Sequence, residues 1–258
     1  MTAERLRIER LSAGYGRERI IRDITFSLPE RQFCALVGQN GSGKSTLLRA
    51  VCGLLPYSGH CLIGNAEVSQ MSVKERAAGI GYLSQDSETV KGISCLEMAL
   101  LGFYARFGAF KMPGEPQKRK AMEQLEELGA AELANKDFAS VSTGQRQLVR
   151  VARTLVTEPG LLILDEADAA LDLQHRKDVF SALKKRTQSG GSVLLVSHDI
   201  NAVLGIADRI IMLRNGELTD DGPCTPENAE SIQTAMQKLY GSVEVFCRGG
   251  RLMMGELP

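Results

Sequence analysis

The hydrophobic pattern along the chain predicts an α/β fold built around a parallel sheet. Three short runs, 33–38 (FCALVG), 160–165 (GLLILD) and 192–197 (SVLLVS), are almost entirely aliphatic. Continuous apolar runs of this length are typical of strands that helices cover on both faces, and such strands form parallel sheets. In contrast, apolar and polar residues alternate through 5–16 and 20–28. This alternation predicts an antiparallel β subdomain near the N-terminus.

Two segments between the first and second aliphatic runs have helical periodicity. They are 95–108 and 117–129, and a turn-rich break, 112–116 (MPGEP), lies between them. We therefore predict a helical subdomain inserted into the core of one domain that covers 1–258. The predicted division is a core with its β subdomain at 1–86 and 154–258, and a helical subdomain at about 87–153.

The C-terminal part is predicted to contain two helices and two hairpins. A helix is expected at 199–207, and then a hairpin at 209–218 whose Asn215-Gly216 pair is a strong signal for a tight turn. A polar helix at about 226–240 and a second hairpin at 243–256 follow.

The segment 38–46 (GQNGSGKST) carries the first chemical signal, because it fits the phosphate-binding template G-x-x-x-x-G-K-[ST] at every fixed position. An apolar run precedes it and a helix-compatible segment, 46–55, follows it, as the template requires and a plain glycine-rich turn does not. The glycines let backbone N–H groups point inward at an anion, and the helix that follows presents its positive end. Lys44 then reaches the β- and γ-phosphates, and the Ser45 hydroxyl ligates Mg²⁺. The nucleotide-binding residues predicted here are Gly38, Asn40, Gly41, Ser42, Gly43, Lys44, Ser45 and Thr46.

A pair of carboxylates ends the second aliphatic run. Asp165 and Glu166 lie at the C-terminal end of an apolar strand, where ligands bind in open α/β sheets. Asp165 is expected to hold Mg²⁺ through water, and Glu166 is expected to polarise a water molecule in line with the γ-phosphate. An Asp-Glu pair at a strand end is often only solvated, but beside a phosphate loop it indicates a nucleoside triphosphatase.

Composition and charge exclude other classes. The 31 basic and 31 acidic residues give a formal net charge of zero, without the basic excess of a nucleic-acid binder. The six cysteines form no C-x-x-C pair and lie mostly in apolar runs, so we expect reduced, buried thiols in a cytosolic protein. The N-terminal segment is charged, unlike a signal peptide, and no apolar run approaches the roughly 20 residues of a membrane-spanning helix. Any work at a membrane is therefore expected to be done from its surface, through partners.

With these motifs in order, the chain resembles the ATP-binding cassette (ABC) ATPases over essentially its whole length. Tyr15 stands where the family places the aromatic ring that stacks on adenine, and Gln85 matches the glutamine that touches Mg²⁺ and couples to the membrane domains. The segment 141–147 (VSTGQRQ) matches the family signature, which clamps the ATP bound by the opposite subunit. Asp172, in the sequence ALD, matches the dimer-contacting loop, and His198 matches the histidine that contacts the γ-phosphate.

The resemblance therefore implies a full set of site residues, with ATP and Mg²⁺ as cofactors. The implied catalytic residues are Lys44, Glu166 and His198, and the implied metal-binding residues are Ser45, Gln85 and Asp165. The nucleotide-binding residues outside the phosphate loop are Tyr15, Gln85, Ser142, Gly144 and Gln145.

Each of the added positions has an ordinary structural alternative. In isolation, Tyr15 is an aromatic residue in a turn, Gln85 is a solvated amide and His198 is a core histidine. The segment 142–145 is, by itself, a plain helix N-cap. The joint order and spacing of these positions favours the functional interpretation.

Two departures from the family pattern lie close to the predicted site. Thr143 stands where glycine is usual, and Ala167-Asp168 replaces Pro-Thr. None of these residues is assigned to the chemistry, so we expect them to affect rate and not class. Arg146 and Arg150, on the helix after the signature, are expected to be surface or ion-pair residues.

Further segments resemble the ATPase subunits of bacterial importers for iron-siderophore, haem and cobalamin-type complexes. These segments are 100–110, 171–180, 198–210 and 239–246. The resemblance implies a homodimer of ATPase subunits beneath a dimer of polytopic permeases, at the cytoplasmic face of the bacterial inner membrane. A periplasmic substrate-binding protein would deliver the ligand, and no nucleic-acid partner is implied.

Three alternatives stay open. The first is an importer subunit for another substrate, such as an oxyanion. The second is a soluble ABC ATPase that acts on a ribosome or nucleic-acid complex, although such proteins usually carry two cassettes or a long coiled-coil insertion. The third is a binding module without hydrolysis, against which the presence of Glu166 and His198 argues.

Overall fold

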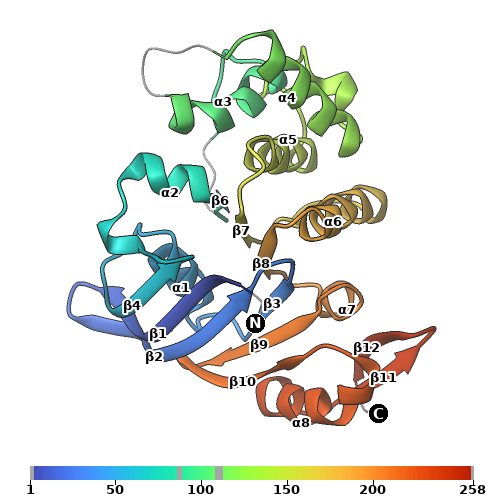
Figure 1. Cartoon of the computed structure of the whole chain (residues 1–258). Helices are drawn as coiled ribbons and strands as arrows, with labels where there is room; N and C mark the ends of the chain where they lie inside the picture. Colours follow the sequence, from blue (N-terminus) through green and yellow to red (C-terminus); the bar gives the residue numbers. More distant parts are fainter. Residues whose placement is uncertain (1–2, 86–88, 108–112, 257–258) are drawn as a thin grey trace.

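The aliphatic runs form neighbouring strands of a central sheet in the computed structural model, which describes residues 3–85, 89–107 and 113–256 (Figure 1). The sheet has the strand order β10-β9-β3-β8-β7-β6, and β6, β7, β8, β3 and β9 pair in parallel. The strands are β3 (Phe33–Val37), β6 (Ile80–Leu83), β7 (Leu161–Asp165), β8 (Ser192–Val196), β9 (Arg209–Arg214) and β10 (Glu217–Pro223). The predicted parallel core sheet is confirmed.

The three runs are apolar throughout because each strand is buried on both faces. Phe33, Ala35 and Val37 of β3 enter a core that helices cover. Cys34 and Leu36 point to the other face and enter a second core, shared with the β subdomain. Both cores exclude water, so neither face of the strand carries polar residues.

The alternating N-terminal segments form the predicted antiparallel β subdomain. Its strands are β1 (Glu4–Tyr15), β2 (Glu18–Pro29), β4 (Tyr57–Ile63) and β5 (Ala66–Glu67), in the order β2-β1-β4-β5. The pairing of β1 with β2 has register shifts, and Arg10 and Asp23 have positive φ angles of 47° and 51°. Such irregularities increase the local twist, which lets this sheet curve over the core.

Helix α1 (Lys44–Val51) lies between the two sheets and contacts β1, β2 and β7. It ends earlier than the helix-compatible segment 46–55, because Gly53 adopts a left-handed conformation with φ of 66°. Short α2 (Val73–Gly79) follows β5, after a 3₁₀ turn at Val68–Gln70. The Ser72 side chain and Glu75 form a capping box at its start.

A helical part lies at one end of the molecule, at the top of Figure 1. It contains α3 (Cys95–Phe107), α4 (Glu115–Glu127), α5 (Thr143–Leu155) and a 3₁₀ turn at Ala131–Leu133. Arg150 of α5 is only 8% exposed and lies over the ring of the fully buried Phe138, 5.6 Å from its centroid. The expectation of a surface position is therefore wrong for Arg150, whose guanidinium packs on an aromatic face.

The C-terminal part follows the predicted order of helices and hairpins. It contains α6 (Leu173–Gln188), α7 (Ile200–Leu204), α8 (Ala229–Tyr240), a 3₁₀ turn at Pro226–Asn228, and the hairpin of β11 (Val243–Arg248) and β12 (Arg251–Glu256). Asn215 and Gly216 connect β9 to β10 with φ angles of 52° and 80°, as a tight hairpin turn requires. Only glycine fits at Gly216, because an added Cβ would lie 1.9 Å from the Ile20 carbonyl oxygen.

Five of the six cysteines are buried, and all six are free thiols. Cys247 is exposed on β11, so the expectation of buried cysteines is wrong at this position. Among the described residues, no helix combines the length and the apolar character needed to cross a bilayer.

Candidate functional site

The loop between β3 and α1 has the geometry of an anion cradle. Gly41 and Gly43 have φ angles of 78° and 103°, which side chains rarely adopt. Lys44 begins α1, and its Nζ atom donates to the carbonyl oxygens of Gly38 at 2.8 Å and Gln39 at 3.0 Å. The lysine cation and the positive end of α1 therefore face the same space.

A cleft of about 430 Å³ opens beside this loop. It is lined by Tyr15, Ile20, Asn40, Gly41, Gly43, Lys44, Ser45, Thr46, Gln85, Glu166 and His198. The fold therefore brings residues from five separate segments of the sequence to one cleft. Of the predicted loop residues, Gly38 and Ser42 do not line it, and Ser42 is 5% exposed.

Asp165 ends β7 beneath the cleft and is only 2% exposed. Burial raises the pKa of this carboxyl, and a hydrogen bond with Ser45 and the charge of Lys44 partly oppose the rise. Its Oδ1 atom is buried without a hydrogen-bond partner among the described residues. A buried acceptor next to the Ser45 hydroxyl supplies the oxygen ligands that Mg²⁺ prefers, so this corner fits a magnesium ion.

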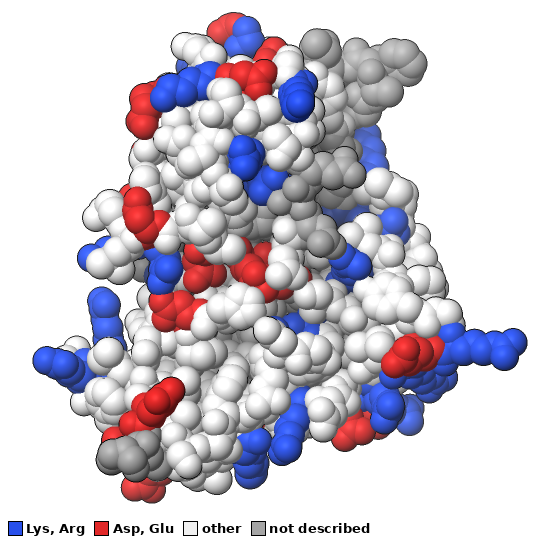
Figure 2. Space-filling view, turned by 180° about the vertical axis from the view of Figure 1, so that it is seen from behind, with Lys and Arg blue, Asp and Glu red and all other residues white. Residues whose placement is uncertain are grey.

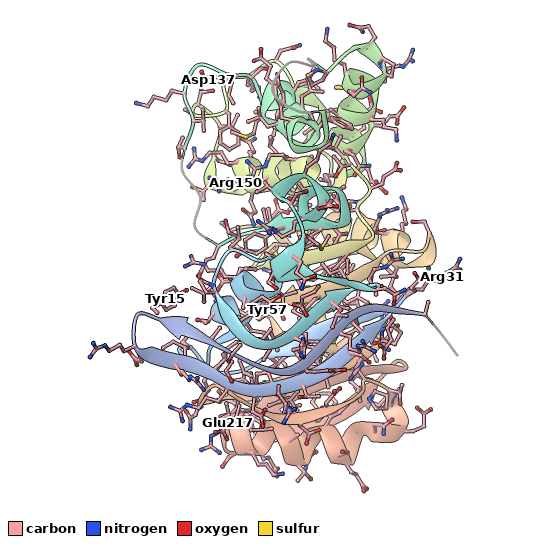
Figure 3. All side chains as sticks on the ribbon, turned by 60° about the vertical axis from the view of Figure 1, so that its left-hand side comes forward. Tyr15, Arg31, Tyr57, Asp137, Arg150 and Glu217 are labelled. Carbon is pink, nitrogen blue, oxygen red and sulfur yellow. The ribbon has the colours of Figure 1, made fainter. Side chains whose placement is uncertain are left out.

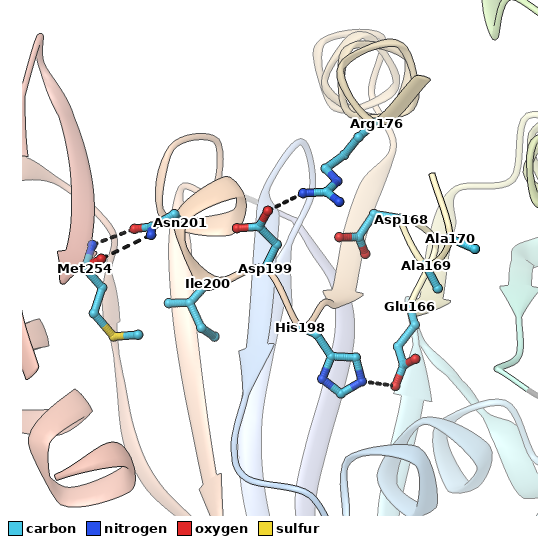
Figure 4. Close-up of a pocket in the computed structure, with 10 residues that line it drawn as sticks. All are labelled: Glu166, Asp168, Ala169, Ala170, Arg176, His198, Asp199, Ile200, Asn201 and Met254. Carbon is cyan, nitrogen blue, oxygen red and sulfur yellow. Dashed lines mark hydrogen bonds and ion pairs between the residues drawn. The ribbon is translucent and has the colours of Figure 1, made fainter. Parts of the chain in front are cut away.

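Glu166 is the centre of a small polar cluster above Asp165. Its Oε1 atom accepts a hydrogen bond from Gln85 Nε2 at 2.9 Å and lies 2.6 Å from His198 Nε2 (Figure 4). The Glu166 side chain is 14% exposed, and that of His198 is 58% exposed. These three predicted residues therefore meet, although Gln85 and His198 lie 81 and 32 residues from Glu166 in the sequence.

The backbone at Glu166 is strained, and neighbouring segments hold it in place. Its φ is 60°, a left-handed conformation that costs a non-glycine residue on the order of 1 kcal/mol. Its N–H donates to the Val196 carbonyl oxygen at 2.9 Å. Gln147 Nε2 of α5 donates to the carbonyl oxygens of Glu166 at 3.0 Å and Ala167 at 3.2 Å. Sequence reasoning assigned no role to Gln147, because nothing in one helix shows which loop it faces.

Tyr15 lies at the end of β1, at the rim of the β subdomain (Figure 3). Its side chain is 47% exposed, and its hydroxyl accepts a hydrogen bond from Arg49 Nη1 at 3.2 Å. Arg49 belongs to the last turn of α1. No sequence signal marks this contact, since a basic residue near a helix C-terminus is ordinary.

The signature segment starts α5 and is also a helix N-cap. Ser142 Oγ accepts from the Gln145 N–H at 3.2 Å, and Gln145 Oε1 accepts from the Ser142 N–H at 3.0 Å. A separate hollow of about 400 Å³ lies here, lined by Ser142, Thr143, Gly144, Gln145, Ala170, Leu171, Asp172 and His175. The signature residues line this hollow and not the phosphate-loop cleft. One copy of the chain thus separates two groups of residues that were predicted to contact ATP.

The loop of Asp172 packs directly against the signature. An added Cβ at Gly144 would lie 2.6 Å from the Ala170 carbonyl oxygen, so the two backbones approach closely. Asp172 caps α6 by accepting the His175 N–H at 2.9 Å. The carboxylate predicted to contact a second subunit therefore lies at the rim of the signature hollow.

A third cavity, of about 520 Å³, lies on the other side of Glu166 and His198 (Figure 4). Arg176 forms an ion pair with Asp199 at this cavity. Asn201 pairs with Met254 of β12, donating to its carbonyl oxygen at 3.1 Å and accepting its N–H at 2.6 Å. The C-terminal hairpin is therefore fixed to the helix that follows His198.

Comparison with known proteins gives a consistent family. Residues 21–169 match the family model described as ABC transporter. The chain is 32% identical to the ferric enterobactin transport ATP-binding protein FepC of Escherichia coli, over 92% of this chain and 87% of that protein. It is also 32% identical to a sulfate/thiosulfate import ATP-binding protein of Rhizobium meliloti, over 86% of this chain and 63% of that protein. A putative ABC transporter ATP-binding protein of Lactiplantibacillus plantarum is 36% identical, but the chain spans only 41% of its length.

Solved structures give the same result. A putative metal-chelate type ABC transporter in an inward-facing conformation contains a chain that is 27% identical, with a TM-score of 0.78 over 99% of this chain and 97% of that chain. A dimeric ATP-binding cassette in a post-hydrolysis state, bound to ADP and Pi, is also 27% identical, with a TM-score of 0.77 over 85% of this chain and 98% of that chain.

Proposed function

This chain belongs to the ABC transporter family, and from that premise we propose that it hydrolyses ATP to drive uptake of a metal chelate through a partner permease. The observation that carries the proposal is the cluster of Glu166, Gln85 and His198 at the rim of the phosphate-loop cleft. Hydrolysis needs a group that accepts a proton from water close to a bound triphosphate. The Glu166 carboxylate lines the phosphate-loop cleft, which supports this role.

The roles that we propose follow from position. The loop N–H groups and Lys44 hold the triphosphate, and Glu166 accepts the proton of the attacking water molecule. His198, which contacts the Glu166 carboxylate, is placed to reach the γ-phosphate. Ser45, Gln85 and Asp165 would hold Mg²⁺, which when bound neutralises charge on the phosphate oxygens. The exposed ring of Tyr15 is placed to stack on the adenine base.

We further propose that two copies complete each site. The signature hollow and the phosphate-loop cleft are separate in one chain, so Ser142, Gly144 and Gln145 would contact the ATP held by a partner copy. A dimeric cassette among the solved relatives supports this arrangement. The dimer would bind a polytopic permease dimer at the cytoplasmic face of the membrane, with a periplasmic binding protein supplying the cargo.

The substrate class is proposed from the relatives alone. FepC is named for ferric enterobactin transport, and the similar solved structure is described as metal-chelate type. The sulfate/thiosulfate relative favours an oxyanion importer as the second candidate. An activity on nucleic acid has less support, since Lys and Arg side chains are interspersed with acidic ones on the face that Figure 2 shows.

Three measurements test this function. The tagged protein should co-purify from detergent-solubilised membranes with a polytopic membrane protein. In proteoliposomes, the amount of ATP hydrolysed should rise in a fixed ratio to the amount of cargo taken up. Uptake of labelled ferric siderophore, haem, cobalamin, sulfate and molybdate should then be compared in cells with and without the gene. If cells without the gene lose only sulfate or molybdate uptake, the cargo is an oxyanion and not a metal chelate. Co-purification with ribosomes in place of a membrane protein would refute the transport function.

A paired substitution at the signature tests the two-copy site. Gly144→Ala is expected to lower ATP turnover roughly 10- to 100-fold, because its Cβ would collide with the Ala170 carbonyl oxygen and displace the Asp172 loop. Thr143→Gly is expected to keep wild-type turnover, because the Thr143 hydroxyl only accepts a hydrogen bond from Arg146 at 3.1 Å. Its cost in stability should stay below about 0.5 kcal/mol by helix propensity. Steady-state ATPase rates and thermal unfolding of both variants measure this, and loss of activity in Thr143→Gly at unchanged stability would contradict it.

A further inference from the structure

A buried hydrogen bond joins the loops that carry Glu166 and His198. The Ser197 hydroxyl donates to Asp168 Oδ2 at 2.7 Å, and both residues are 6% exposed. The same hydroxyl oxygen accepts the Asp199 N–H at 3.0 Å. Ser197 immediately precedes His198, and Asp168 follows Glu166 by two positions. The bond therefore spans the gap between the two loops directly behind the Glu166–His198 contact.

The Ser197–Asp168 hydrogen bond lies just beyond the point where the pairing of β7 with β8 ends. The pairing of β7 with β8 stops at Asp165 and Val196, and the Glu166 N–H reaches the Val196 carbonyl oxygen at 2.9 Å. Beyond that point, side chains join the two loops: His198 contacts Glu166, and Ser197 donates to Asp168 in the buried interior. Backbone pairing fixes the strands, and buried side-chain hydrogen bonds restrain the loops that follow them.

Ser197 is the main side-chain hydrogen-bond partner of the buried Asp168 carboxylate. Arg176 and Asp199 are the charged groups that act on Asp168 from the neighbouring elements, and Arg176 is itself paired with Asp199. Burial raises the pKa of Asp168, and the hydrogen bond from Ser197 opposes that rise. Figure 4 shows Asp168 on the side of Glu166 that faces Arg176 and away from the phosphate loop. This position does not favour direct contact between Asp168 and the nucleotide.

We propose that Asp168 and Ser197 are positioning residues that hold His198 Nε2 against the Glu166 carboxylate for ATP hydrolysis. This inference rests on the proposed function for its kinetic consequence, but the geometry that it describes exists without nucleotide. It also gives the Asp168 departure from the family pattern a role, since its carboxylate accepts the hydrogen bond of the Ser197 hydroxyl.

The central test replaces Ser197 by Ala and compares it with a matched control. Ser192 begins the same strand, β8, is fully buried, and its hydroxyl donates to the Pro29 carbonyl oxygen at 2.9 Å, at the end of the strand away from His198. Ser197→Ala is expected to lower kcat for ATP hydrolysis roughly 10- to 100-fold with KM for ATP unchanged, since a small misplacement of a reacting group has effects of this size. Ser192→Ala also removes a buried hydrogen bond and is expected to keep kcat.

Two further variants separate position from folding. Ser197→Thr keeps the hydroxyl and is expected to restore most of kcat, and Asp168→Asn keeps an acceptor oxygen and should retain more activity than Asp168→Ala. The double variant Ser197→Ala/Asp168→Ala should be no slower than the slower single variant, because both remove one interaction. Equal kcat for Ser197→Ala and Ser192→Ala would overturn the proposal, and so would additive losses in the double variant.

A readout without ATP keeps this inference separate from the proposed function. The chain has only three histidines, so the ring signals of His198 can be assigned by NMR with a His198→Gln variant. Ser197→Ala should shift these signals in the nucleotide-free protein, and Ser192→Ala should leave them in place. If Ser197→Ala shifts these signals but the wild-type protein hydrolyses no ATP, the proposed function is refuted and the positioning geometry stands. Unchanged His198 signals in folded Ser197→Ala would refute the positioning pair, whatever the ATPase activity.

Discussion

A Glu166→Gln variant is expected to bind ATP normally and to hydrolyse it about 10²- to 10⁴-fold more slowly than the wild-type protein. The glutamine side chain keeps the shape of glutamate and an oxygen that can accept from Gln85 Nε2, which lies 2.9 Å from Glu166 Oε1. It cannot accept a proton from the attacking water molecule. Binding should therefore survive while the chemical step slows. Hydrolysis assays quenched at timed intervals measure the chemical step, and ATP titration measures binding.

The same variant is expected to accumulate as a head-to-tail dimer with two ATP molecules at the interface. Hydrolysis normally removes the ligand that joins the copies, so a protein that cannot hydrolyse ATP stays joined by mass action. Size measurements with ATP and with ADP should show a dimer only with ATP. Adding Ser142→Arg should abolish that dimer, because a bulky cation would then fill the signature hollow.

Glu30→Gln is the matched control for both effects. Glu30 follows β2 and pairs with Arg5 at 2.6 Å, away from the lining of the phosphate-loop cleft. This variant should hydrolyse ATP and dimerise as the wild type does. Hydrolysis by Glu166→Gln at the wild-type rate would show that Glu166 is not the base. A Glu166→Gln dimer that persists equally with ADP would contradict the two-copy site.

Lys44→Ala is expected to lose ATP hydrolysis and to weaken ATP binding about 10- to 150-fold, the cost of removing hydrogen bonds from a charged donor. Burial lowers the pKa of Lys44, and the charges of Asp165 and Glu166 oppose this shift. The Lys44 ammonium is thus partly shielded from water, which strengthens its attraction for an anionic ligand. Its hydrogen bonds within the chain go to the carbonyl oxygens of Gly38 and Gln39, so we expect little change in thermal unfolding.

Lys74→Ala serves as the control, since Lys74 is exposed on α2 and does not line the cleft. ATP binding by calorimetry and thermal unfolding should be measured on both variants. Undiminished ATP affinity in a folded Lys44→Ala protein would refute the assignment of the phosphate loop.

Local features of this chain could be predicted from the sequence because each depends on a few neighbouring residues. The phosphate loop is one continuous segment whose glycines and lysine act through their own backbone. Asn215-Gly216 specified its turn because both positions need positive φ angles. The capping box of Ser142 and Gln145 likewise needs only residues three apart. The continuous apolar runs predicted strands buried on both faces, and the two cores on either side of β3 explain why.

Contacts between distant segments could not be predicted from the sequence in the same way. The contact of Arg49 with Tyr15, the hydrogen bonds from Gln147 to the loop after Glu166, and the packing of Arg150 on Phe138 each join separate elements. The amphipathic pattern of a helix shows that one face is buried, but not against which partner. The exposure of Cys247 has the same origin, since an outer hairpin and a core strand can share an apolar sequence.

The sequence by itself determined the class of chemistry, because the phosphate loop and the Asp165-Glu166 pair are local and carry their functional groups with them. The tertiary structure alone decided which groups meet. Strand order places β7 beside β8, and this brings Glu166, His198 and the buried Ser197–Asp168 bond together. It also puts the signature in a different hollow from the phosphate loop. Strand order results from the packing of whole faces across long separations, and the periodicity of any one segment is compatible with many such packings.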